Sequence, residues 1–298
     1  MFLTSLVLTA ILAQAAPRPG PPQTDETVPV QKGGRLLVNN LAGDVLVRTW
    51  DKESVHVVAR HQARTTVSVR PTAAGVSISA SGTRGPQGSV DYEITAPAWM
   101  PIRVEGTYNF VTIEGAQAEV FANTMRGDVT IRGGSGTVTA KSVEGEVRVE
   151  GARGKVNVSS VNEKVTISDT SGDITADSIN GGIRMSAIEA KSVDASTVNG
   201  DIVYDGRIAD GGHYSFGTHN GSLSLGIPDS VNATFTIRTY QGSFSTDLPL
   251  TGVSRADLER GKKVTTALGN GSADVSLESF GGSIRLRKAS GNARGSGR

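Results

Sequence analysis

The sequence predicts an all-β fold, a single-chain β-solenoid (β-helix-like) with two-strand central rungs of about 18 residues and wider C-terminal rungs of about 21 residues. Glycine returns every nine residues through the middle of the chain, an alternating apolar pair follows most of these glycines, and a large apolar residue stands two positions before every second one. Such a fixed short period with strand-like alternation is typical of units that bury their apolar faces by stacking. The structural glycine positions are Gly127, Gly136, Gly145, Gly154, Gly172, Gly181, Gly200, Gly221 and Gly242.

Each central strand is expected to turn alternate side chains toward a thin core. In one representative unit, the positions expected to face the core are Val143, Gly145, Val147 and Val149. The positions expected to face solvent are Glu144, Glu146 and Arg148. We interpret the glycine as an inward position where a side chain would crowd the opposite strand, or where the backbone bends.

The charged outward positions agree with the stacking of successive rungs. An offset of one rung places Glu146 beside Lys164 and Lys155 beside Asp173. Opposite charges in register support strand pairing, although each exposed pair contributes only about 0.2–1 kcal/mol. We interpret this surface as a solvated face with register-setting pairs, against the alternative of a charged binding strip.

The segments that flank the repeat are also predicted to be strands. Residues 34–61 alternate like hairpin strands, and the glycine period lengthens to about 21 residues between Gly221 and Gly242. Residues 268–288 are expected to supply the closing rungs. One β-solenoid domain over residues 28–288 therefore accounts for the folded part of the chain.

The two ends have different compositions. Residues 1–16 resemble a signal peptide, with an apolar run followed by a small-x-small cleavage site, and that run is too short to span a bilayer as a stable anchor. Residues 17–27 are expected to be a disordered Pro-rich leader, and residues 289–298 a disordered basic tail. We therefore expect an exported protein, located in the periplasm, on the cell surface or in the medium, with no transmembrane segment after signal removal.

Composition excludes several function classes. The 298 residues contain no cysteine, which excludes disulfides, thiolate metal sites and a cysteine nucleophile. The 30 basic and 29 acidic residues nearly balance, so net charge favours neither nucleic acid nor a membrane surface as a partner. We expect no cofactor, because no phosphate loop or metal motif is present.

A family resemblance rests on five segments taken in order. They are GDVLVRTWDKESVHVVA, SVEGEVRVE, STVNGDIVY, NATFTIRTYQGSFSTDLP and GNGSADVSLESFGGSIRLRK. Together these segments resemble a bacterial family of adhesin-like β-solenoid domains of unknown function, over roughly residues 30–288. The resemblance implies an exported, elongated β-solenoid and supplies no catalytic or ligand residues.

Catalytic and metal chemistry find little support in the residues. A calcium-binding nonapeptide needs an Asp ligand where this chain places Val138 and its equivalents, so we expect no metal site. Polysaccharide lyases and hydrolases also use β-solenoids, and Asp173, Asp201 and Asp205 are the candidate acids here. We interpret them as turn and surface residues, because two-residue corners are too short to build the walls of a cleft.

Four late residues are the candidates for binding: His213, Tyr214, His219 and Tyr240. They could form a metal site or a sugar platform, but for His219 we favour the interpretation as a partly buried histidine in a wider rung. The hypothesis from the sequence is an exported, non-catalytic, adhesin-like binding or structural module of the cell envelope. Its expected partner is a cell-surface polymer or an envelope protein, and the alternative function is a carbohydrate-active enzyme.

Overall fold

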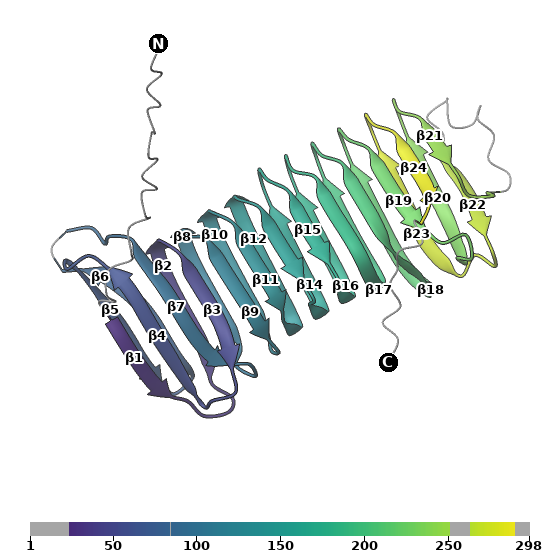
Figure 1. Cartoon of the computed structure of the whole chain (residues 1–298). Coiled ribbons are helices and arrows are strands. Elements are labelled where there is room, and N and C mark those ends of the chain that lie inside the picture. Colours follow the sequence, from purple (N-terminus) through teal and green to yellow (C-terminus); the bar gives the residue numbers. More distant parts are fainter. Residues whose placement is uncertain (1–23, 84, 251–262, 290–298) are drawn as a thin grey trace, which may run out of the picture.

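The computed structural model describes residues 24–83, 85–250 and 263–289. Within these residues, 24 strands form one largely parallel sheet that wraps nearly closed around an axis, giving an elongated solenoid-like stack (Figure 1). Two ladders of paired strands run along the stack and form its two sides.

The first side contains β2 (Arg35–Ala42), β6 (Gly75–Gly82), β8 (Ile102–Tyr108), β10 (Val120–Arg126), β12 (Ser135–Glu144), β14 (Arg153–Ser160), β16 (Ser171–Ser178), β20 (Ala233–Thr239) and β23 (Ala273–Ser279). The second side contains β3 (Val45–Trp50), β7 (Val90–Pro97), β9 (Val111–Ala116), β11 (Val129–Gly133), β13 (Val147–Glu150), β15 (Val165–Ser168), β19 (Leu223–Ile227), β21 (Phe244–Thr246) and β24 (Ile284–Lys288). Two long strands contribute to both sides, namely β17 (Ile183–Thr197) and β18 (Ile202–Thr218). The end strands are β1 (Thr24–Pro29), β4 (Ser54–His61), β5 (Thr65–Thr72) and β22 (Val264–Leu268).

The pairing register follows the glycine period. Val147 pairs with Val165 in the central rungs, and Ile202 pairs with Leu223 in the wider ones. The ion pair expected from stacking is present, with Lys164 Nζ 3.2 Å from Glu146 Oε2. Lys155 is likewise the register partner of Asp173.

Side-chain hydrogen bonds between neighbouring rungs repeat at the same two offsets. The Glu146 amide donates a hydrogen bond to the Asp128 carboxylate, 18 residues earlier in the chain. The Ser222 amide donates to the Asp201 carboxylate, 21 residues earlier. The offset between neighbouring rungs thus reaches 21 residues at this point, whereas Gly221 and Gly242, whose spacing predicted the wider rungs, are separated by the rung that contains Gly282.

The chain order breaks at both ends of the stack. Strands β2 and β3 lie between β6/β7 and β8/β9, so the first parallel rung is enclosed by two later ones. Strands β23 and β24 lie between β18/β19 and β20/β21, as the yellow strands among green neighbours in Figure 1 show. The expectation that residues 268–288 supply the closing rungs is therefore wrong in position, because this segment is inserted before the rung of β20 and β21. Strands β1, β4, β5 and β22 pair antiparallel at the two ends.

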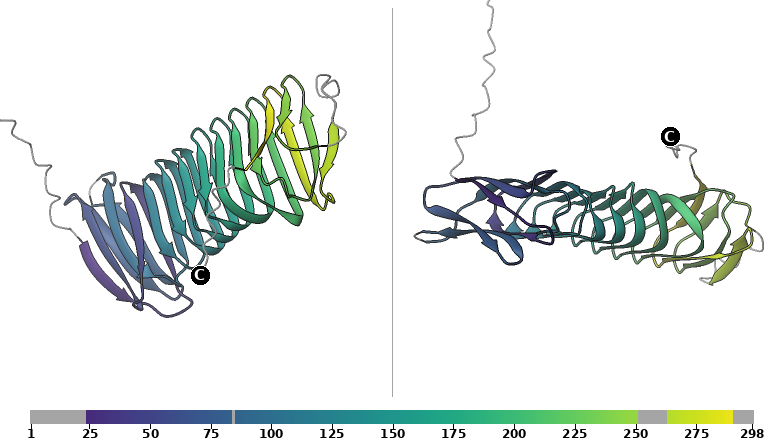
Figure 2. Two further views of the ribbon diagram at one scale, coloured as in Figure 1. Left: turned by 45° about the vertical axis from the view of Figure 1, so that its right-hand side comes forward. Right: turned by 90° about the horizontal axis from the view of Figure 1, so that it is seen from below.

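The core is a thin layer between the two sides (Figure 2). The central valines and isoleucines expected inside are fully buried: Val147, Val149, Val165 and Ile167 are each 0 % exposed. Near the C-terminal end the layer takes larger side chains, with Tyr204 and Phe216 almost fully buried and their ring centroids 5.1 Å apart.

The expected inward position of Val143 is wrong. Val143 is 37 % exposed, and Met125, Ile179 and Val198 at equivalent positions are 57, 46 and 43 % exposed. The residue just before each of them is a buried serine or threonine, which shifts the alternation by one at the corner. Ser142, for example, donates its hydroxyl hydrogen to the Gly127 carbonyl oxygen of the preceding rung at 2.9 Å.

The glycine positions are explained by the neighbouring rung and not by the opposite strand. A Cβ on Gly145 would lie 2.1 Å from the carbonyl oxygen of Gly127. In the alternate series, Gly154 has φ +107° and its Cβ would lie 2.4 Å from the Gly136 oxygen. Glu163 stands in the same corner series with an exposed side chain, and its carbonyl oxygen would be 1.9 Å from a Cβ on Gly181.

The expected terminal segments lie mostly outside the described residues. The signal peptide at 1–16 and the tail residues 290–298 fall there entirely. Residues 24–27 of the expected disordered leader instead belong to β1, which pairs with β4. The prediction of a disordered leader is wrong for those four residues.

Candidate functional site

The stack is disturbed where β17 and β18 pass from one side to the other. The pairing register between β17 and β18 shifts between Ala190 and Ser192. Beyond the shift, Ser192 pairs with His213, which lies 21 residues later in the chain. Ala187, in the same part of β17, has φ 51°, a conformation that is uncommon for a residue with a side chain. A hollow of about 620 Å³ lies beside these irregularities, and Glu189, Ala190 and Lys191 help to line it.

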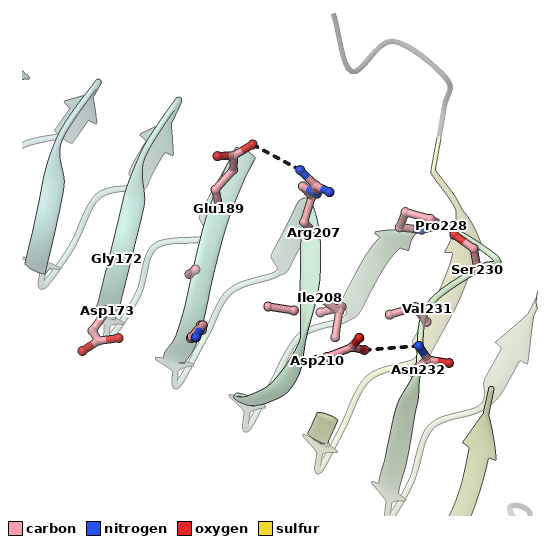
Figure 3. Close-up of a pocket in the computed structure, with 13 residues that line it drawn as sticks. Gly172, Asp173, Glu189, Arg207, Ile208, Asp210, Pro228, Ser230, Val231 and Asn232 are labelled. Atoms are coloured by element: carbon pink, nitrogen blue, oxygen red, sulfur yellow. Dashed lines mark hydrogen bonds and ion pairs between the residues drawn. The ribbon is translucent and has the colours of Figure 1, made fainter. Parts of the chain in front are cut away.

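Charged and amide groups border this first hollow (Figure 3). Glu189 and Arg207 form an ion pair at 3.7 Å on one border. On another border, Asp210 accepts hydrogen bonds from Asn232 Nδ2 at 3.2 Å and from Ser272 Oγ at 2.9 Å. These carboxylates are thus turned to partners on the rim.

A second hollow, of about 540 Å³, lies on the first side of the stack. Its lining includes the hydroxyl-bearing residues Ser192, Ser215, Thr234, Thr236 and Ser276. Its charged groups include Asp194, Lys263 and the ion pair of His213 with Asp274, in which Nδ1 and Oδ2 are 3.4 Å apart. The side chains of His213 and Asp274 are 76 and 71 % exposed, so this pair is open to solvent.

The two hollows are neighbours along the chain. Lys191 lines the first and Ser192 the second, and Asn232 and Thr234 are divided in the same way. We call the two hollows together the depression. Its surface offers hydroxyl, amide, carboxylate and basic groups, which suits a ligand rich in hydrogen-bonding groups.

Tyr214 holds the wall of the depression in place. The ring is buried, and the phenol donates a hydrogen bond to the Ala190 carbonyl at 2.5 Å and accepts one from the Ala209 amide at 2.8 Å. Burial raises the pKa of Tyr214, and the Ala209 amide opposes part of that rise. The hydroxyl therefore joins the two bulged segments and stays protonated at neutral pH.

The structure separates the four binding candidates from the sequence. His213 and Tyr214 line the second hollow, Tyr214 as a buried structural residue. His219 and Tyr240 lie instead at the corner of the stack, each in contact with Phe280. The His219 residue is exposed at this corner, with its ring stacked on Phe280.

The three candidate acids do not converge on one point. Asp173 lies in β16, on the first side of the stack. Asp201 precedes β18 and Asp205 lies within it, and both belong to the second side. Asp205 is bound to Arg287 at 2.5 Å, and Asp201 accepts the Ser222 amide hydrogen at 2.7 Å. The extended strand between these two separates them by roughly 13 Å, beyond the ~5–9.5 Å between the paired carboxylates of glycosidases.

An exposed apolar column, which the alternation in the sequence did not predict, runs along the corner that follows the strands of the first side. We define the apolar column as Leu41, Met125, Val143, Val161, Ile179, Val198, His219, Phe280 and Tyr240, with Thr107 between Leu41 and Met125. Next to it runs a ladder of hydrogen-bonded asparagine amides formed by Asn162, Asn180, Asn199 and Asn220, with N···O distances of 2.9, 3.0 and 2.9 Å. The serine or threonine before every column residue except Leu41, which follows Asn40, was the available signal for this corner.

The rings at the end of the apolar column stack on one another. His219 and Phe280 lie 4.7 Å apart at an interplanar angle of 9°, and Tyr240 lies 5.2 Å from Phe280. The Arg238 guanidinium lies 5.0 Å from the Tyr240 ring centroid. Phe280 therefore contacts a ring on each neighbouring rung, which leaves less of its faces for a stacking sugar.

Metal-binding clusters and membrane-spanning helices are absent from the described part of the chain. No group of three or more His, Cys, Asp or Glu side chains that could hold a metal ion occurs within residues 24–83, 85–250 and 263–289. No helix among these residues is long and apolar enough to cross a membrane.

Comparison with known proteins gives a distant structural match. No family model and no curated protein sequence matches the chain. A crystal structure from Clostridium sporogenes, described as a "putative cell adhesion protein", is similar to this chain at 8 % sequence identity and a TM-score of 0.25. The match covers 89 % of this chain and 99 % of that one.

Proposed function

We propose that this chain is an exported, non-catalytic binding module of the cell envelope, adhesin-like in character, that holds a hydroxyl-rich cell-surface polymer in the depression. The scaffold is a β-solenoid with two-strand rungs of about 18 residues that widen to about 21 residues near the depression. The resemblance of residues 30–288 to adhesin-like solenoid domains supports the same class.

The observation that carries the proposal is the open, polar lining of the depression. Hydroxyl groups from Ser192, Ser215 and Ser276 stand on neighbouring strands, which are spaced ~4.8 Å apart. Carboxylates and an imidazole flank them, and polymers of sugars are recognised by such convergent hydrogen-bonding groups. A surface open along several rungs suits a chain that continues beyond its contact with the protein.

The alternative function is a carbohydrate-active enzyme of the lyase or hydrolase kind. Asp173, Glu189 and Asp210 line the first hollow, which is the observation in its favour. Two of these carboxylates are turned to partners on the rim, Glu189 to Arg207 and Asp210 to Asn232 and Ser272. That arrangement favours a binding role over paired acid and base catalysis.

Retention on insoluble polysaccharides, paired with an assay for released reducing ends, tests both functions. The proposal expects retention without turnover, and a loss of at least about tenfold in affinity for Asp194→Ala/Asp274→Ala. Asp247→Ala is the matched control, because Asp247 is an exposed acid on the other side that pairs with Arg285 at 3.6 Å. Turnover that disappears with Asp173→Asn or Glu189→Gln, two acids that line the first hollow, would establish the enzyme instead.

The location of the protein is tested separately. Cell fractionation is expected to place it in the envelope or in the medium, with residues 1–16 removed from its N-terminus. Full-length protein confined to the cytoplasm contradicts the export proposal.

A further inference from the structure

The apolar column is an unusual surface for a solenoid edge. Seven of its apolar and aromatic side chains are between 37 and 57 % exposed, with Val143 and Met125 at the two limits. The members follow one another on successive rungs with little interruption. Contiguous exposed apolar surface of this kind marks an interaction site.

We propose that a second copy of this chain covers the apolar column, with the two columns antiparallel and a twofold axis at Val161. The pairing would be isologous, since the same surface of each copy takes part. This proposal is independent of polymer binding in the depression.

The order of residues along the column is what selects the antiparallel arrangement. Counted in rungs from Val161, the column has Val143 and Ile179 one step away on either side, and Met125 and Val198 two steps away. A twofold axis at Val161 therefore brings apolar residues against apolar residues on both sides. Three steps away the facing residues are Thr107 and His219, and four steps away Leu41 meets Phe280.

Charge beside the column supports the same register. Lys141 and Asp177 lie two residues before Val143 and Ile179, on the same flank of the column, and both are exposed. The antiparallel pairing places Lys141 of one copy against Asp177 of the other. In its own chain, Lys141 is in register with the uncharged Asn123 and Ser159. Asp177 is in register with Ser159 and Ser196, and it accepts a hydrogen bond from the Ser196 hydroxyl at 2.7 Å. A parallel pairing would align equivalent rungs instead and lose this match.

The area of the apolar column is sufficient for a dimer of low affinity. Eight rung steps from Leu41 to Phe280 extend over roughly 38 Å, and the column with its flanks is roughly 17 Å wide. Each copy would bury roughly 600 Å², at the lower end of specific interfaces. The dimer is therefore expected to dissociate at low protein concentration, and its mass is to be followed over a wide concentration range.

Cysteine cross-linking tests the geometry directly, because the chain has no cysteine of its own. Val161→Cys, on the axis, is expected to form a covalent dimer rapidly under mild oxidation. Val143→Cys and Ile179→Cys are expected to cross-link when mixed but only slowly alone. Arg148→Cys, exposed on the second side, is the control.

The outcomes separate cleanly. Cross-linking of Val161→Cys no faster than the control overturns the dimer, and self-cross-linking of Val143→Cys as fast as the mixture overturns the antiparallel register. Sedimentation adds a check without cysteine. Ile179→Glu should weaken dimerisation at least about tenfold while the circular-dichroism spectrum of the β fold stays unchanged. Lys141→Asp should also weaken dimerisation, and the charge swap Lys141→Asp/Asp177→Lys should restore it. A monomer at every concentration for the unmodified chain also overturns the proposal.

Discussion

Replacing Gly145 with alanine tests the explanation of the glycine period. The added Cβ would meet the Gly127 carbonyl oxygen at 2.1 Å, the Gly127 carbonyl carbon at 2.4 Å and Ser142 Oγ at 2.9 Å. Ordinary contacts to a Cβ are ~3.4 Å or longer, so two backbone segments must separate by about 1 Å. They are also joined by the hydrogen bond from Ser142 to Gly127, which would be stretched. Overpacking of this kind costs about 1–3 kcal/mol.

Gly217→Ala is the matched control, because Gly217 is in the parallel strand β18 and no atom lies within 4 Å of its added Cβ. Its expected effect is neutral or a gain of about 0.4–1 kcal/mol, since alanine restricts the unfolded chain. Urea unfolding followed by circular dichroism measures both changes. Equal stability of the two variants would refute the close approach of rungs as the reason for glycine.

Four further predictions follow from other contacts. Tyr214→Phe removes the phenol that binds Ala190 and Ala209 and should cost about 1–3 kcal/mol in urea unfolding, whereas Tyr240→Phe at the surface should cost less than about 0.5 kcal/mol. Asn180→Ala breaks two amide hydrogen bonds of the asparagine ladder and should cost about 0.5–1.5 kcal/mol, and an unchanged melting temperature would speak against the ladder. Arg287→Ala leaves the half-buried Asp205 without its partner at 2.5 Å and should destabilise more than Lys288→Ala, whose pair with Asp229 is exposed. Burial raises the pKa of Tyr92 and Tyr204 in the folded protein. Their contribution to the free energy of unfolding is therefore complete below the unfolded tyrosine pKa of ~10 and is lost as pH rises above it. The absorbance of their phenolates should appear only when the protein unfolds, and its appearance in the folded protein would contradict the burial.

The interior of the central rungs could be predicted from sequence because strand alternation is a local property. Val147 and Val165 face the core, and Glu146 meets Lys164, as the period implies. The corner could not be predicted by extending the same alternation. Ser142 turns inward to bind a backbone carbonyl, and this displaces Val143 to the surface.

The order of strands that are distant in the sequence could not be predicted from the glycine period either. The insertion of β23 between β18 and β20 depends on pairings between residues that lie two or three rung lengths apart in the chain, and a local period carries no information on them. The depression depends on the same kind of distant pairing, which brings Asp274 beside His213. For this reason the sequence grouped His213 with His219, although the structure places them at opposite ends of one strand segment.

The enclosed rungs at the two ends impose an order on folding. A chain that emerges from a pore N-terminus first can lay down β12 to β16 one rung at a time, since each pairs with the rung just made. The rung of β2 and β3 is different, because it remains open until β8 and β9 arrive. At the other end, β20 and β21 have no parallel partner until β23 and β24 come between them and β18 and β19. The last described strands are therefore the closing step of assembly, and a polypeptide cut short after residue 250 would leave its final rung detached from the finished stack.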